Sequence, residues 1–472
     1  MAASSHSNMD MAVSFAGILN EKHCPEHLQV LKTFTTALRD KEYRDSVEEE
    51  AFSSLLKLLC RLCDDLQTVS DEGQSLLQLQ LMADCFRAQR NACVQSTRNQ
   101  GVMRKLGFIE VSLQAQSLLL NSNLECRYEP LRCGIQFLGN LAVGNQMCKD
   151  DIWQQSFPNH LLVNDEKTVN YTSMVLHTCL DEAKVEELSK SQNIQVALRV
   201  MELCRTQPDL DWTVLIATQH FLKSSALVES TYSGMSHRER VTLLELILAQ
   251  LKEEGSENCG IPASVARFLA ASFQNGCGAV LTLAIGSTSS DEEALTVMGL
   301  LDVLCEMTSD LGQFMFLQDH PDLVVTTVEL LEQVHAIGKT SKNVFSSSQN
   351  FSTLTGDGTS PSHSPVISFK AHLIRLIGNL CHSNPSNQNK VRELDGIPLI
   401  LDNCNIDSNN PFIGQWAIFA IRNLLEHNRQ NQELVATLER QGSADYSALR
   451  ELGYMVEERE GSLLLKPVRK DS

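Results

Sequence analysis

The C-terminal part of the chain carries one helical pattern twice, and this repetition limits the possible folds more than any other feature. In the first copy, FKAHLIRLIGNLCHSNPSNQ, apolar residues around Asn379 follow the spacing of one helix face, and Asn387-Gln388 comes eight residues later. The second copy, WAIFAIRNLLEHNRQNQ, places Asn423 and Asn431-Gln432 at the same spacing, 44 residues further along the chain. A short helical unit of this kind cannot bury its apolar face alone, so neighbouring copies must stack.

The same pattern occurs twice in the N-terminal half. Asn91 is followed by Asn99-Gln100 at the same distance. Asn140 lies in IQFLGNLAVGNQ, where Asn145-Gln146 comes three residues early and predicts a shortened turn. Stacked units of this kind share one core and expose a long concave surface. The sequence therefore predicts a binding surface rather than an enclosed pocket.

Composition supports an all-helical chain without nucleic-acid or membrane partners. The 472 residues are too many for one compact core. The chain has only 24 glycines and 12 prolines, and aromatic residues make up 6% of it. A period of this length allows about nine to eleven helical units. The net charge of −19 argues against nucleic acid and anionic membranes as main partners, because both require a basic surface. No apolar run approaches the roughly 20 residues of a membrane span.

The fifteen cysteines are scattered singly, which indicates reduced thiols and a cytosolic protein rather than a disulfide framework. Cys60 and Cys63 form the one CxxC pair, and no second pair or histidine follows at zinc-ligand spacing. Motifs for an activated serine, a phosphate-binding loop or a dinucleotide site are absent from the sequence. We therefore expect no catalytic residues, no cofactor and no metal site.

A Ser/Thr-rich stretch separates the middle of the chain from the C-terminal repeats. Thirteen of the 29 residues from 340 to 368 are Ser or Thr, and they lack apolar periodicity, which predicts disorder. Near the C-terminus, residues 444–452 predict a short helix, and the alternation from Tyr454 to Leu465 predicts a β-hairpin that caps the last repeat. The expected divisions are a frayed end (1–10), helical repeats (11–339), a disordered loop (340–368), C-terminal repeats (369–465) and a tail (466–472).

The repeats resemble a known family. The Gly-Asn-Leu and Arg-Asn-Leu helices are similar to armadillo repeats, whose units span roughly 40–47 residues. The stretch from Leu373 to Gly442, with ELDGIPLILDNCN at Glu393–Asn405, resembles the C-terminal domain of the ataxin-10 family. Weaker similarity extends upstream through RCGIQFLGN and EEALTVMGLLDVLCEMT. The resemblance implies an armadillo/HEAT-like α-solenoid.

In armadillo proteins, an asparagine of the third helix lines the concave groove and hydrogen-bonds an extended peptide. The positions that match this motif are Asn91, Asn140, Asn379 and Asn423. An amide suits the role because it offers both a donor and an acceptor to a peptide group. The alternative is that each asparagine ties down its own inter-helix turn. Both interpretations stay open at the level of sequence.

Nuclear-import receptors place a tryptophan four residues before this asparagine, which builds a slot for basic side chains. The corresponding residues of this chain are Arg87, Gln136, Arg375 and Phe419. Trp416 lies seven residues before Asn423 and faces differently on the helix. A karyopherin-like transport receptor is therefore the second interpretation, after a non-catalytic scaffold.

The resemblance also implies a biological setting. It implies a cytoplasmic and perinuclear adaptor, also at the centrosome and midbody, that acts in neurite outgrowth, neuronal survival and cytokinesis. The implied partners are a G-protein β subunit, the O-linked N-acetylglucosamine transferase and further copies of the chain.

Two serines of the Ser/Thr-rich stretch are candidate phosphorylation sites. Ser360 and Ser364 each precede a proline, which holds the serine in the extended form that a proline-directed kinase accepts. Their phosphates are expected to dock where cations gather, near Lys370 and Arg375. An inert linker is the alternative.

Overall fold

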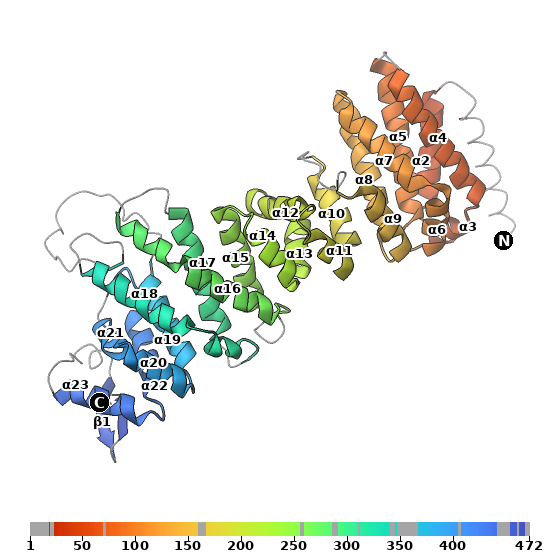
Figure 1. The fold of residues 1–472 in the computed structure, drawn as a ribbon. Helices are drawn as coiled ribbons and strands as arrows, with labels where there is room; N and C mark the ends of the chain where they lie inside the picture. The colour runs from red at the N-terminus through yellow and green to blue at the C-terminus, as the bar shows by residue number, and fades with distance from the viewer. Residues whose placement is uncertain are drawn as a thin grey trace, which may run out of the picture. The chain divides into compact units, whose positions relative to one another are not determined.

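The computed structural model describes residues 18, 23–68, 72–158, 167–254, 259–285, 291–309, 312–339, 345–346, 367–404, 407–440, 454–459 and 462–467. The chain divides into two compact units, Met1–His220 and Phe221–Ser472, which we consider separately. Within the described ranges, helices make up both units, and the one sheet is a hairpin near the C-terminus (Figure 1).

The first unit is built around a row of helices in which each contacts the next. This row consists of α2, α5, α8, α10 and α13. Phe34, Phe86, Phe108 and Phe137 are fully buried in its core. The helices are α2 (Pro25–Ala37), α3 (Lys41–Ser46), α4 (Glu49–Thr68), α5 (Glu72–Ala92), α6 (Thr97–Leu106), α7 (Phe108–Asn121), η1 (Glu125–Arg127), α8 (Tyr128–Ala142), α9 (Gln146–Ser156), α10 (Val169–Cys179), α11 (Glu182–Leu188), α12 (Ile194–Thr206) and α13 (Asp211–Gln219).

The second unit repeats this arrangement with the row α15, α17, α19 and α22. Its helices are η2 (Phe221–Lys223), α14 (Ser225–Tyr232), α15 (His237–Glu254), α16 (Ala263–Gly276), η3 (Cys277–Ile285), α17 (Asp291–Met307), η5 (Met315–Asp319), α18 (Leu323–Gly338), α19 (Phe369–Cys381), α20 (Pro385–Glu393), α21 (Gly396–Asp402), α22 (Ile413–Leu425) and α23 (Arg429–Arg440). None of the helices in the described part of the chain is long and apolar enough to cross a membrane.

The 44-residue period corresponds to one step along the row of the second unit. Asn379 lies in α19 and Asn423 in α22, and these two helices pack closely. Leu376 and Ile377 of α19 are fully buried, as their spacing predicts. A Cβ atom on Gly378 would lie 2.9 Å from the Phe419 ring, so the absence of a side chain lets the two helices approach. The prediction of an all-α, armadillo/HEAT-like stack is confirmed.

The predicted hairpin is also confirmed. Strands β1 (Tyr454–Arg459) and β2 (Ser462–Pro467) are antiparallel, and Val456 pairs with Leu465. Strand β2 lies next to α23, the last helix, and runs two residues into the segment predicted as a tail.

Three other predictions fall wholly or mostly outside the described residues. These are the frayed end at 1–10, the helix at 444–452 and the disordered loop at 340–368, including Ser360 and Ser364. Within the loop, however, Phe345 is fully buried. It departs from the predicted disorder because its side chain packs against Phe369, with ring centroids 6.3 Å apart.

Candidate functional site

In the first unit, the candidate groove asparagines bond to the preceding helix of the row. The Asn91 Nδ2 atom of α5 donates to the Thr35 carbonyl of α2, at 3.0 Å. One step further, Asn140 Nδ2 of α8 donates to the Arg90 carbonyl of α5, at 3.2 Å. Both asparagine side chains are half-buried.

The second unit shows the same geometry. Asn423 Nδ2 of α22 donates to the Gly378 carbonyl of α19, at 2.9 Å. Asn379 Nδ2 donates to the Cys305 carbonyl of α17 at 3.1 Å and to the Thr308 hydroxyl at 3.0 Å. The exposed fractions of Asn379 and Asn423 are 5% and 4%. The amide donors thus join successive helices of the row and do not tie down the turn of their own repeat. The contact with a groove peptide stays a prediction.

The glutamine of two Asn-Gln pairs makes the opposite connection, to the next helix of the row. Gln388 Nε2 of α20 lies 2.8 Å from the Asn423 carbonyl and 3.3 Å from the Glu426 carbonyl, at the end of α22. Gln100 Nε2 of α6 lies 2.9 Å from the carbonyls of both Asn140 and Val143, at the end of α8. The first carbonyl belongs to the row asparagine, and the second lies three residues later.

A third glutamine makes this contact without an Asn-Gln pair in the sequence. Gln318 Nε2 of η5 lies 3.0 Å from the Asn379 carbonyl and 2.9 Å from the His382 carbonyl. We call Gln100, Gln318 and Gln388, with the carbonyl pair that each binds, the amide clamps. The last carbonyls of a helix lack partners within the helix, so each clamp supplies donors that the helix end needs.

The asparagine of the pair also connects neighbouring repeats. Asn387 Nδ2 donates to the Gln318 carbonyl of the preceding repeat at 2.8 Å and to the Leu380 carbonyl of its own repeat at 2.9 Å. Asn431 bonds to the Gln388 and Leu424 carbonyls in the same way.

The turn after Asn140 is not shortened, contrary to the prediction. Asn145 caps α9, and its side chain accepts from the Cys148 amide at 3.2 Å. Asn384 has this role at the start of α20, so Asn145 corresponds to Asn384 and not to Asn387. Cys148 occupies the place of Asn387, with its Sγ atom 3.8 Å from the Gln100 carbonyl.

Two cations proposed to dock phosphates are already engaged. The Lys370 side chain is 6% exposed, and its Nζ atom lies 3.4 Å from Asp407. Arg375 pairs with Glu306 at 3.1 Å, and its guanidinium carbon lies 4.9 Å from the centre of the Trp416 ring. Both cations thus already have carboxylate partners, and the docking of phosphates near Lys370 and Arg375 stays a prediction. The Arg375 contact also shows that the Trp416 ring already binds a cation of its own chain.

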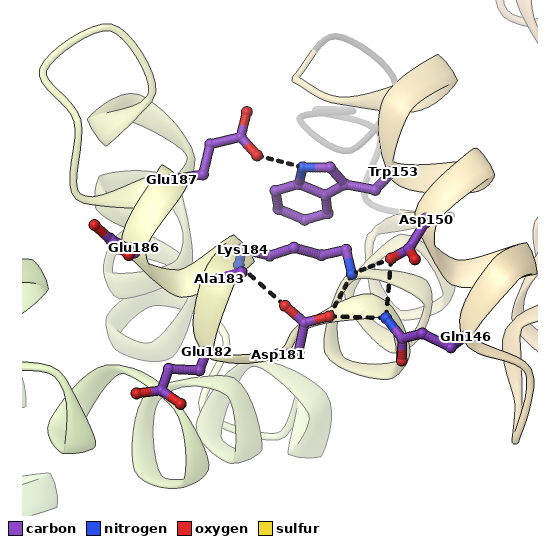
Figure 2. Close-up of a pocket in the computed structure, with 9 residues that line it drawn as sticks. All are labelled: Gln146, Asp150, Trp153, Asp181, Glu182, Ala183, Lys184, Glu186 and Glu187. Carbon is purple, nitrogen blue, oxygen red and sulfur yellow. Dashed lines mark hydrogen bonds and ion pairs between the residues drawn. The ribbon is translucent and has the colours of Figure 1, made fainter.

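The first unit has an acidic hollow of about 750 Å³ between α9 and α11 (Figure 2). The Lys184 ammonium lies between Asp150, at 2.7 Å, and Asp181. The indole nitrogen of Trp153 donates to Glu187 at 2.8 Å. The residues around the hollow are Gln146, Asp150, Trp153, Asp181, Glu182, Ala183, Lys184, Glu186 and Glu187.

The charges inside the hollow stabilise one another. Burial opposes the Lys184 charge, but the hydrogen bonds to Asp150 and Asp181 raise its pKa overall. Burial also opposes the Asp181 carboxylate, and the bonds from Lys184 and Gln146 hold the pKa of Asp181 below its usual value. These side chains are satisfied by one another, and their bonds attach the start of α11 to α9.

The described His, Cys, Asp and Glu side chains are the candidate ligands for a metal ion. Within them, no group of three or more His, Cys, Asp and Glu side chains is arranged to hold a metal ion. In the CxxC pair, burial raises the pKa of Cys63 to about 12, so its thiolate is scarce at neutral pH.

Comparisons with known proteins agree with the geometry of the repeats. Residues 369–466 match the family described as the spinocerebellar ataxia type 10 protein domain. Ataxin-10 of Xenopus tropicalis is 43% identical over 443 residues, covering 92% of this chain and 90% of the relative. Human ataxin-10 is 39% identical over 462 residues, covering 94% and 95%. An ataxin-10 homolog of Dictyostelium discoideum is 47% identical over 103 residues, or 22% of this chain. The chain belongs to the ataxin-10 family.

Proposed function

We propose that this chain is a non-catalytic scaffold that presents stacked helical repeats to protein partners. The observation that supports this most directly is the use of the repeated amides. Asn379, Asn423 and the amide clamps bond to backbone carbonyls of neighbouring helices. The repeated residues therefore hold the stack of helices together. Partner specificity then belongs to the side chains that differ between repeats.

The resemblance to ataxin-10 supports a more specific role for the scaffold. We assign it to neurite outgrowth, neuronal survival and cytokinesis, in the cytoplasm and around the nucleus, with further sites at the centrosome and midbody. Its partners under this proposal are a G-protein β subunit, the O-linked N-acetylglucosamine transferase and further copies of the chain. A transport receptor has less support, because Arg375 covers Trp416, the one tryptophan near the repeat motif of α22.

The groove asparagines remain part of the proposal in a restricted form. Asn91 and Asn140 keep partial exposure. Asn91 Oδ1 already accepts from the Arg90 guanidinium at 3.5 Å, so Asn140 Oδ1 is the better candidate for accepting a bond from a peptide amide. Asn379 and Asn423 are nearly inaccessible. A partner peptide that uses this contact would therefore lie on the first unit.

A binding experiment with purified proteins tests the scaffold. The full chain is titrated separately with the G-protein β subunit and with the O-linked N-acetylglucosamine transferase in a calorimeter. Saturable binding to either protein supports the proposal, and Asn140→Ala, which removes the Oδ1 acceptor, should weaken it if the groove contact is used. Absence of heat and of co-elution with both proteins at tens of micromolar would contradict the partner assignment.

Phosphorylation of Ser360 and Ser364 is tested by a phosphopeptide map of the chain from dividing cells. We expect phosphate on at least one of the two serines. If both are unmodified, or if replacing both with alanine leaves partner binding unchanged, the segment is a spacer.

A further inference from the structure

Phe345 fixes one point of the Ser/Thr-rich stretch to the second unit. Its side chain is fully buried against Phe369, the first residue of α19. Its carbonyl accepts a hydrogen bond of 2.6 Å from Asn410 Nδ2, and Asn410 is itself 1% exposed. Phe345, one of two phenylalanines in this polar stretch, thus has its ring in an apolar site and its carbonyl in a buried hydrogen bond.

The site that receives Phe345 is a buried polar network. Asn410 Nδ2 also donates to Asp407 at 2.8 Å, and Asn410 Oδ1 accepts from the Lys370 backbone amide at 3.0 Å. The Lys370 ammonium lies 3.2 Å from Asn403 Oδ1 and 3.4 Å from Asp407. The network joins the Phe345 carbonyl to the first turn of α19, so departure of Phe345 should loosen that turn.

Ser346 follows Phe345 and lies at the C-terminal end of α18. Its Oγ atom is 2.7 Å from the point that a Cβ atom on Gly338 would occupy, and Lys370 Nζ is 4.0 Å from the same point. The end of a helix carries partial negative charge, which disfavours a further anion. Of the nearby cations, Lys370 is paired with Asp407, and Lys339 lies 3.9 Å from Asp402.

We propose that Ser346 is a phosphorylation site and that Phe345 is the latch it controls. With Phe345 in its site, Ser346 is held against α18, and a kinase cannot bind it in extended form. When Phe345 leaves, a serine kinase can transfer the γ-phosphoryl group of ATP. The Ser346 Oγ–phosphorus bond forms, the bond to the bridging oxygen of ADP breaks, and a base of the kinase takes the hydroxyl proton.

The phosphate then keeps the latch open. It adds about 1.5–2 negative charges beside the C-terminal end of α18, so the closed state becomes less favourable. By linkage, the repulsion that opposes closure of the modified latch equally makes the phosphorylated serine less favourable in the closed state than in the open one. The opened latch exposes the Phe369 ring and the Asn410 amide, which become available to another segment or protein.

Hydrogen exchange of the full chain, followed by mass spectrometry, tests this proposal. The reporter is the Lys370 amide, whose hydrogen bond to Asn410 depends on the network. Ser346→Glu introduces the charge, and Ser346→Gln is the control of the same size without charge. Phe345→Ala removes the latch, and Phe351→Ala is the same change six residues further along the same stretch.

We expect Ser346→Glu and Phe345→Ala to accelerate exchange at residues 367–373 about tenfold, with no change in the two controls. Equal effects of Ser346→Glu and Ser346→Gln would overturn the role of charge. Unchanged exchange in Phe345→Ala would overturn the latch. Acceleration throughout α19 to α22 in that variant would also overturn it, because Phe345 would then be an ordinary core residue.

Discussion

At the scale of single residues, burial decides the chemistry of the cysteines. Burial raises the pKa of Cys179 and Cys404 to about 12 and that of Cys204 to about 11. Each unit of increase lowers the thiolate fraction at pH 8 about tenfold, and the thiolate is the reactive form. Cys126, in contrast, is exposed.

We therefore predict that iodoacetamide at pH 8 modifies Cys126 first in the folded chain. The buried thiols should react about 100-fold (Cys204) to about 1,000-fold (Cys179 and Cys404) more slowly, and at similar rates to Cys126 only after unfolding. Mass spectrometry of peptides at timed intervals measures this order, and Cys126→Ser should remove the fast phase. Early labelling of Cys179 or Cys404 would contradict the packing described for α10 and α21.

The sequence predicts some of these residue roles because they recur at a fixed spacing. Asn379 and Asn423 are visible in this way, and so is the burial of Leu376. The direction of their hydrogen bonds is not visible, because spacing along the chain does not identify the neighbouring backbone. Gln318 lies 61 residues before Asn379, so the Ser/Thr-rich stretch hides its place in the period. Phe345 lacks any periodic context.

At the scale of helices, close approach of α19 and α22 depends on Gly378. A Cβ atom there would lie 2.9 Å from the Phe419 ring and 3.1 Å from the Ala420 Cα atom, which cannot move aside alone. A Cβ atom added to Gly276, at the end of α16, would meet no other atom within 4 Å.

The variant Gly378→Ala should therefore lower the free energy of unfolding of the second unit by about 1–3 kcal/mol, although alanine favours helices. Gly276→Ala is the matched control and should be neutral or slightly stabilising. Urea denaturation followed by circular dichroism gives both values. A stabilised Gly378→Ala would mean that α19 and α22 are further apart than described.

The amide clamps allow a second comparison between helices. Gln388→Met removes donors from the carbonyls of Asn423 and Glu426, and unsatisfied buried carbonyls cost about 1–3 kcal/mol. Gln432 is the equivalent residue of the last repeat, and the bond described for it goes to Leu425 of its own repeat. Gln432→Met should thus cost less, and its exchange effects should stay within α22 and α23. Equal losses for the two variants would argue against coupling through the clamps.

At the scale of the whole molecule, the chain consists of two compact units that meet in sequence at His220 and Phe221. Composition and period indicate one continuous series of repeats and do not reveal this boundary. The reason is that helices on both sides have similar lengths and apolar content, while the division depends on which helices contact each other.

We predict that residues 1–220 and 221–472 each fold when produced alone. Each fragment should show a helical circular dichroism spectrum and a cooperative thermal transition, and the two spectra should sum to that of the full chain. A fragment that stays unfolded while the full chain is folded would show that its core needs the other half.

The amide clamps have a consequence for how such a chain can evolve. A clamp recognises the backbone of its neighbour, which every amino acid supplies, and not any particular side chain. A repeat can therefore accumulate substitutions on its outer face, or arise by duplication, without losing the joint to the next one. Relatives can then diverge widely in what they display while the joints between their repeats stay the same, and the last features to be lost should be a few amides at fixed intervals.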